Sequence, residues 1–191
     1  MSLGDTQLQL ATQRPAVAAD DAGDVPGPPS WLLRTTIFGG VHVQQLPLAT
    51  EVIFASIVRC TRRQNGCVRF SYVPEGSITP RRYRCQPDYE IQQREEALER
   101  LIGPLLQADS DAIRDDVRSW LQPSFTDIHY GLPGYGQLFV LCPQQIQTGA
   151  EDGSEMGAFC FLKQPQRATS LRVRLQEYLP FGLEPGLIYV T

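Results

Sequence analysis

The sequence is poor in several residues and patterns that would identify a function. Its 191 residues include a single lysine, Lys163, and only two histidines. No apolar run approaches the roughly 18 residues that a membrane-spanning helix needs. Glycine is too scarce for a collagen-like chain, and 42% hydrophobic residues exclude disorder throughout. We therefore expect a folded chain of one domain, long enough to bury a core without metals or disulfides.

Nucleotide-binding and metalloprotease motifs are also missing. There is no G-x-x-x-x-G-K-[ST] loop, no G-x-G-x-x-G after a predicted strand and no H-E-x-x-H helix. The net charge of −4 gives no general reason to bind nucleic acid or anionic lipid. We expect no cofactor. The ratio of arginine to lysine, 16 to 1, is explained more simply by a GC-rich coding bias than by selection for phosphate-binding forks.

The N-terminal region predicts an arm rather than a targeting signal. The first twenty residues lack the basic and apolar regions of a secretory signal peptide, which favours a cytoplasmic protein with reduced thiols. The odd number of cysteines, five, agrees with that expectation. Residues 1–30 are rich in proline, glycine and aspartate and predict an extended arm. Residues 31–191 are expected to form a single β-rich domain.

A short internal repeat predicts the fold. Residues 31–73 carry clusters of β-branched and aromatic residues that are typical of strands. Within them, residues 37–41 repeat the pattern of residues 53–57 at an offset of 16, with two large apolar residues, two small ones and a β-branched one. A strand, a tight corner and a second strand would produce this pattern, as in a β-solenoid coil. A small antiparallel sheet or barrel is the alternative.

The rest of the chain predicts helices that cover this core. Apolar residues at helical spacing predict helices near 88–107, 110–121 and 169–179. Residues 135–142 and 158–162 predict short strands. The predicted fold class is therefore mainly β with short helices (α+β), a short right-handed β-solenoid-like or small-sheet core capped by two or three helices.

Seven arginines within 26 residues form the most unusual local feature. Aromatic residues are interleaved with them and Glu75 is the one acid among them, a composition that can bind single-stranded nucleic acid or an acidic protein surface. The simpler interpretation is internal or subunit docking, because residues 88–127 carry ten acidic residues against four arginines. An acidic partner comes second and nucleic acid last. The candidate partner-binding residues are Arg59, Arg62, Arg63, Arg69, Arg81, Arg82 and Arg84.

The cysteines lack the close spacing of common zinc sites. Small apolar thiols in a core are the simplest interpretation, so we expect no metal site. A disulfide between the second and third cysteines under oxidising conditions is chemically possible, and so is a distributed zinc site. The zinc ligands would be Cys67, Cys85, Cys142 and His129.

Two other arrangements could carry chemistry. A thiol-dependent enzyme would use Cys142 or Cys160 as the nucleophile, with Asp127 orienting His129 as the base. The acidic turn at residues 151–155 could hold calcium, but it lacks the full EF-hand pattern, and a solvated turn is favoured over it. Neither arrangement matches a known catalytic or calcium-binding signature.

Two longer segments resemble part of a bacterial protein family. They are RRQNGCVRFSYVPEGSITPRRYRCQPD at 62–88 and GAEDGSEMGAFCFLKQPQRATSLRVRLQEYLPFGLEPGL at 149–187. The similarity is to the C-terminal block of long bacterial proteins of unassigned function, in which it follows β-solenoid-like coils. It extends over about residues 31–191. The resemblance implies a solenoid fold and an association with phage-tail-like or contractile injection assemblies, but it transfers no site residue.

These observations predict a non-enzymatic structural or protein-interaction module that belongs to a larger bacterial assembly. We expect a protein partner or self-assembly, with nucleic acid less favoured and no membrane span. The alternatives are a zinc-binding or Cys/His-dependent enzyme and a nucleic-acid binder that uses the segment from Arg59 to Arg84.

Overall fold

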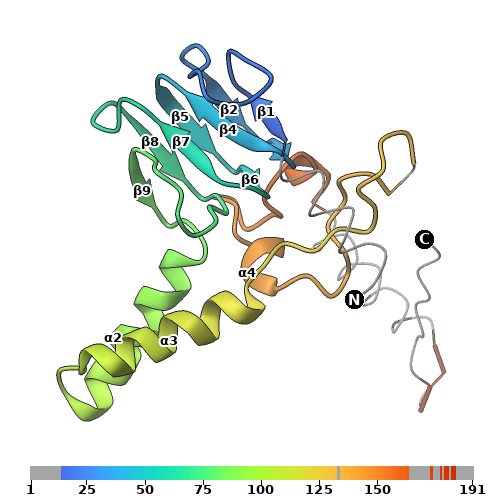
Figure 1. The fold of residues 1–191 in the computed structure, drawn as a ribbon. Coiled ribbons are helices and arrows are strands. Elements are labelled where there is room, and N and C mark those ends of the chain that lie inside the picture. The colour runs from blue at the N-terminus through green and yellow to red at the C-terminus, as the bar shows by residue number, and fades with distance from the viewer. Residues whose placement is uncertain are drawn as a thin grey trace.

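The computed structural model describes residues 14–132, 134–163, 173, 177, 179–180 and 182–183. From residue 14 the chain forms a stack of short parallel strands, continues into a helical hairpin and then returns to the strands through an irregular segment (Figure 1). Among these residues, no helix is both long enough and apolar enough to cross a membrane.

Three parallel sheets form the walls of a short β-solenoid. The first sheet has the order β1-β4-β7, the second β2-β5-β8-β9 and the third β3-β6. Every strand pair is parallel, so the predicted solenoid is confirmed and the alternative of an antiparallel sheet is wrong for the described residues. The strands are β1 (Pro15–Val17), β2 (Trp31–Leu33), β3 (Thr36–Ile37), β4 (Gly40–Val43), β5 (Leu46–Thr50), β6 (Ile53–Phe54), β7 (Val58–Cys60), β8 (Gly66–Arg69) and β9 (Arg81–Tyr83).

The register of the coils differs from the repeat predicted by sequence. In the third sheet, Thr36 pairs with Ile53 and Ile37 pairs with Phe54, so the offset is 17 residues and not 16. The single-residue slip matters because successive side chains on a strand point to opposite faces. With the observed register Ile37 stacks on Phe54 inside the solenoid, whereas the sequence match would have placed it over Ile53, which faces outward.

The interior of the solenoid is a column of apolar side chains. Strand β4 illustrates the pattern, because Val41 and Val43 are buried while His42, between them, is only half-buried. Phe54 and Leu46 are the largest side chains enclosed in this column. Burying each such side chain contributes roughly 1.5–3 kcal/mol, which stabilises strands that are too short to be stable alone.

A second apolar core lies on the outer side of β6. Ile53 packs there with Ile91 and Val117 from the hairpin and with Ile146 and Met156 from the irregular segment. The base of the hairpin and the irregular segment therefore cover the outer face of β6.

The first two predicted helices are present with shifted ends. Helix α2 (Asp88–Ile102) stops before residue 107 because Gly103 has a φ of 88° and Pro104 cannot continue the helix. Helix α3 (Gln107–Trp120) starts earlier than predicted, after Leu106. The predicted helix at 169–179 falls largely outside the described residues.

The segment of residues 122–163, which we call the C-terminal segment, contains little regular structure. It has the short helix α4 (Gln144–Gln147) and the 3-10 turn η1 (Cys160–Leu162). The strands predicted at 135–142 and 158–162 are wrong, because the first range makes only isolated bridges and the second contains η1.

The described part of the predicted arm lies on the solenoid. Strand β1 pairs with β4, and the N–H of Gly27 donates to His42 O at 2.8 Å. Residues 14–30 thus supply backbone partners to a strand that would otherwise be a bare edge. The proline and glycine residues of this segment keep β1 short but do not prevent it from pairing with β4.

We expect Phe54→Ala to lower the free energy of unfolding by about 3–5 kcal/mol, because it leaves a cavity in a column with no free space. Ile57→Ala, at an exposed position three residues away, should cost about 0.5 kcal/mol or less. Urea denaturation followed by circular dichroism measures both. Equal losses in the two variants would contradict the assignment of Phe54 to the interior.

Candidate functional site

The structure divides the seven arginines into two groups. Three are used inside the fold. Arg82 donates to Thr79 Oγ1, Ser77 O and Asp88 Oδ2 at 2.7–2.8 Å, and so ties the last coil to the start of α2. Arg69 approaches Glu151 at 3.5 Å.

Arg84 belongs to the same internally used group, because it lies over the rings of Tyr83 and Tyr89 at 5.7 and 5.6 Å. The other four arginines make no ion pair within the described part of the chain. Glu75, the acid of the segment, instead accepts from Arg118 on α3 at 2.6 Å. The unpaired four are Arg59, Arg62, Arg63 and Arg81.

Three of the unpaired arginines line one hollow of about 700 Å³, which we call the arginine hollow. Arg62 and Arg63 come from the corner between β7 and β8, and Arg81 begins β9. The two corners lie side by side because β8 and β9 are paired, with Cys67 opposite Arg81. The remaining lining is neutral, so no acidic side chain compensates the three charges. The full lining is Thr61, Arg62, Arg63, Gln64, Asn65, Thr79, Pro80 and Arg81.

The aromatic residues of the segment do not line this hollow. Phe70 packs edge-on against Tyr83 with 5.7 Å between ring centroids, and the guanidinium of Arg84 covers Tyr83. Tyr72 is buried, and burial raises its pKa to about 12. Tyr83 is 52% exposed, but neither it nor the other aromatic residues of the segment contribute a ring to the arginine hollow.

The fourth unpaired arginine lies elsewhere. Arg59 lines a smaller hollow of about 180 Å³ together with His42, its ladder partner in β4. The Nδ1 atom of His42 is 2.8 Å from Gly23 O, so this histidine fixes the N-terminal segment to the solenoid.

The four sequence-based zinc candidates are not brought together. Cys85 faces the solenoid interior, Cys142 belongs to the second core, Cys67 is half-buried on β8 and His129 is exposed on a loop. Burial raises the pKa of the Cys85 thiol to about 11 and also raises that of Cys142. All five cysteines are free thiols.

The proposed catalytic pair is a local turn. The backbone N–H of His129 donates to Asp127 Oδ1 at 2.7 Å, and its Nδ1 is 2.8 Å from the same oxygen. These contacts lower the pKa of Asp127. No cysteine is recorded among the hydrogen-bond partners of His129 in the described residues. Cys142 hydrogen-bonds Ser124, and Cys160 lies in a different cluster.

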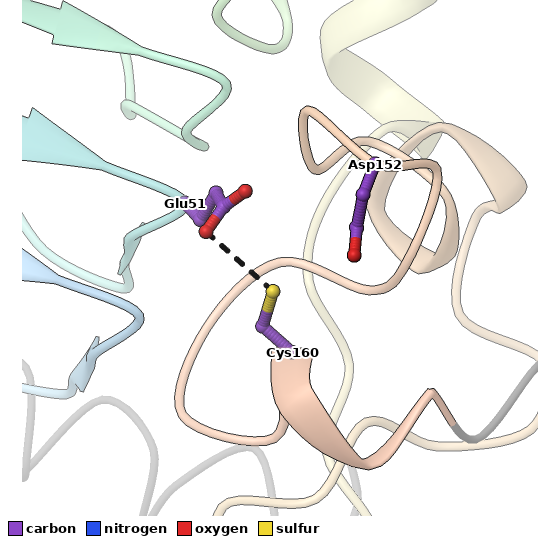
Figure 2. Close-up of side chains that lie close together, drawn as sticks. All are labelled: Glu51, Asp152 and Cys160. Atoms are coloured by element: carbon purple, nitrogen blue, oxygen red, sulfur yellow. Dashed lines mark hydrogen bonds between the residues drawn. The ribbon is translucent and has the colours of Figure 1, made fainter.

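A cluster that sequence did not predict joins the solenoid to the C-terminal segment. Glu51, Asp152 and Cys160 place one ligand atom each within 4.8 Å of one another, and they are the one group of three or more metal-ligand side chains found in the described ranges. Figure 2 shows the Cys160 thiol pointing at Glu51 from the opposite segment. The thiol donates to Glu51 Oε2 at 3.6 Å.

The charges of this cluster are balanced without a metal. Glu51 Oε2 accepts from Arg34 Nε at 2.7 Å, and Asp152 Oδ2 is 3.2 Å from Lys163 Nζ. Burial raises the pKa of Cys160, which keeps the thiol protonated, while the hydroxyl and N–H of Ser154 lower the pKa of Asp152 to about 2. A zinc ion would have to displace the thiol proton and compete with both cations. We therefore interpret the cluster of Glu51, Asp152 and Cys160 as a structural contact that holds the C-terminal segment against the solenoid, and we call it the clasp.

Glu51 shows why the clasp is positioned where it is. It lies at a solenoid corner with a φ of 57°, and its side chain is 4% exposed. Its carbonyl accepts from the N–H of Gly157 at 2.8 Å, and Oε1 accepts from the N–H of Glu151 at 3.3 Å. A glutamate inside the otherwise apolar run LATEVIFASIV was the only sequence signal for it.

Comparison with known proteins adds no assignment. No protein-family model, no curated protein and no solved structure matches the chain. The conclusions on function therefore depend on the site itself.

We expect Glu51→Ala to lower the free energy of unfolding by about 1–3 kcal/mol, because it leaves the buried Cys160 thiol and the part-buried N–H of Glu151 without their acceptor. Glu51→Gly should cost about 1 kcal/mol less, since glycine relieves the left-handed backbone. Urea denaturation compares both with Glu75→Ala, an exposed ion-pair control worth about 1 kcal/mol or less. A Glu51→Ala variant as stable as the control would contradict the clasp.

Glu155 gives a pH-dependent test of the same segment. Its side chain is 4% exposed, and burial raises its pKa to about 7 from an ordinary value near 4.5. The folded state therefore favours the protonated acid, and the corresponding stability is present below pH 4.5 and is lost as the pH rises to about 7.

Glu155→Gln cannot ionise, so we expect it to equal the wild type near pH 4.5 and to exceed its stability by about 1–3 kcal/mol at pH 8. Thermal or urea unfolding at a series of pH values measures the difference. Glu99→Gln, at an exposed position on α2, serves as the control. A difference between Glu155→Gln and the wild type that does not change with pH would refute a raised pKa.

Proposed function

We propose that the protein is a non-enzymatic interaction module of a larger assembly and that the arginine hollow receives an acidic segment of a protein partner. The observation that carries this proposal is the lining of the hollow, three arginines with no acidic residue. Like charges held close together are unfavourable until an anion binds them. A guanidinium group offers two parallel donors that match a carboxylate.

Two features favour a protein carboxylate over nucleic acid. No aromatic residue lines the hollow, whereas proteins that bind single strands combine cationic grooves with exposed rings for stacking. The net charge of the chain is also −4, which opposes non-specific binding to a polyanion. The raised pKa values of Cys85, Cys142 and Cys160 argue against an enzyme that uses one of these thiols, because a protonated thiol is a poor nucleophile.

The wider setting of this module is also part of the proposal. The resemblance to blocks that follow long β-solenoids suggests a component of a bacterial assembly of the phage-tail-like or contractile injection kind, working in the cytoplasm. A module of this kind would bind a neighbouring subunit through a fixed charged surface, and the arginine hollow at a solenoid corner would be such a surface.

We expect a fluorescein-labelled octaglutamate peptide to bind the full chain at low salt and to be released by added salt. The triple variant R62Q/R63Q/R81Q should weaken this binding about tenfold or more, because it removes the three cations of the hollow. Fluorescence anisotropy measures the binding.

The matched control is R94Q/R100Q/R114Q, which removes three arginines from the hairpin and changes the net charge by the same amount. It should bind the peptide as the wild type does. Equal binding by the wild type and the hollow variant would refute the proposal. Tighter binding of an oligo-dT strand, lost in the hollow variant, would replace it with a nucleic-acid function.

A further inference from the structure

The helical hairpin of α2 and α3 extends away from the solenoid after β9 (Figure 1). Its two helices are joined by ion pairs, with Arg94 Nη1 at 2.8 Å from Asp116 Oδ2 and Arg114 Nη2 at 3.2 Å from Glu95 Oε1. Ile91 and Val117, near the base, are the buried residues of the pair. The outer part of the hairpin therefore buries none of its residues against the rest of the described molecule.

The hairpin carries an excess of negative charge at its outer end. The two helices hold nine acidic residues and four arginines. All four arginines form ion pairs, whereas Glu99, Asp109 and Asp115 form none with any described residue. Glu99 lies in the last turn of α2, where the helix dipole is negative and a carboxylate is unfavourable. A cation from another surface would relieve that cost.

The tip between these acids is apolar and exposed. Leu101, Ile102 and Leu106 are 81%, 65% and 72% exposed. Single exposed apolar side chains are common on protein surfaces, but three of them within six residues of a projecting element are typical of a binding surface. Because Glu99 and Asp109 flank them, this surface, which we call the hairpin tip, combines an apolar centre with acidic edges.

We propose that the hairpin tip of one copy docks at the arginine hollow of a second copy. The inference rests on the proposed function and names the acidic partner as this chain itself. Glu99 and Asp109 would pair with arginines of the hollow, which have no acid of their own. Ile78, the chain neighbour of Thr79 in the lining, is 45% exposed, so the apolar residues of the tip have an apolar contact beside the hollow.

The charges favour this contact over a symmetric one. Two hairpin tips facing each other would bring Glu99 and Asp109 of both copies together, and like charges repel. The molecule's own hairpin is anchored at its base by the pair of Arg82 with Asp88 and extends away from the solenoid, so it does not reach its own hollow. This contact uses two different surfaces of the molecule, so a docked pair still has one free hairpin tip and one free arginine hollow. Further copies can add to these, which produces chains or rings.

The test uses two charge-reversal variants of the full chain. The hollow variant is R62E/R81E and the tip variant is E99R/D109R. Sedimentation velocity over a series of concentrations should show salt-sensitive self-association of the wild type. Each variant alone should associate about a hundredfold more weakly, because two attractive pairs become repulsive. Circular dichroism verifies that both variants are folded.

Mixing the two variants gives the decisive result. The hollow variant keeps an intact tip and the tip variant keeps an intact hollow, so the mixture should form a one-to-one complex that grows no further. The chain with all four changes should associate again, since its charges are exchanged. Association that survives both variants would overturn the inference, as would a mixture that stays monomeric.

This outcome is separable from the test of the proposed function. If the wild type remains monomeric at every concentration and still binds octaglutamate through the hollow, the partner is not a second copy, and the proposed function stands. If octaglutamate does not bind and the variants still complement each other, the hollow accepts only the hairpin tip. If neither occurs, both proposals fall.

Discussion

The vertical stacking of inward-facing side chains is the constraint on which the rest of the structure depends. No strand in the described part of the chain is longer than five residues, so no pair of these strands would be stable alone. Each coil gains stability only because its apolar residues rest on those of the coil below, as Ile37 rests on Phe54 and Val41 on Val58. This requirement fixes the register of the coils, and the register in turn sets which corners lie side by side and therefore where the arginine hollow forms.

A stack of coils must also end, and the two ends are closed differently. At the first end, residues 14–30 supply backbone partners to β4 through β1 and Gly27. At the other end, Arg82 occupies the ladder column of Ala49 and Val68 but turns its guanidinium to the residues that lead into α2. An arginine can do this because its long apolar stem covers the column while its head finds acceptors. The chain leaves the solenoid as a hairpin from that point.

The sequence allowed the class of fold to be predicted, because small residues between β-branched ones indicate a corner between strands. It did not allow the register, since a match between residue types cannot distinguish a coil of 16 from one of 17 residues. The arginine-rich segment was also predictable, but not which of its members are unpaired. Arg81 and Arg82 are adjacent and chemically identical. They differ because their side chains leave β9 in opposite directions, so that Arg81 lines the arginine hollow without an ion pair whereas Arg82 pairs with Asp88.

The clasp between Glu51 and Cys160 was beyond prediction because its members are 109 positions apart and no local pattern links them. Metal and catalytic hypotheses based on cysteine spacing had the same weakness. Spacing constrains ligands only when they share one turn or one strand, and Cys67, Cys85 and Cys142 occupy three separate environments.

Ile53 and Phe54 are adjacent in sequence, yet each belongs to a different core. Strand β6 therefore separates the two cores. One of its faces packs into the solenoid interior, and the other packs against the base of the hairpin and the C-terminal segment. Any disturbance that rotates this strand would exchange the two side chains and disorder both compartments at once. The solenoid and the part formed by the hairpin base and the C-terminal segment are therefore coupled through the adjacent residues Ile53 and Phe54. We expect the two parts to unfold together.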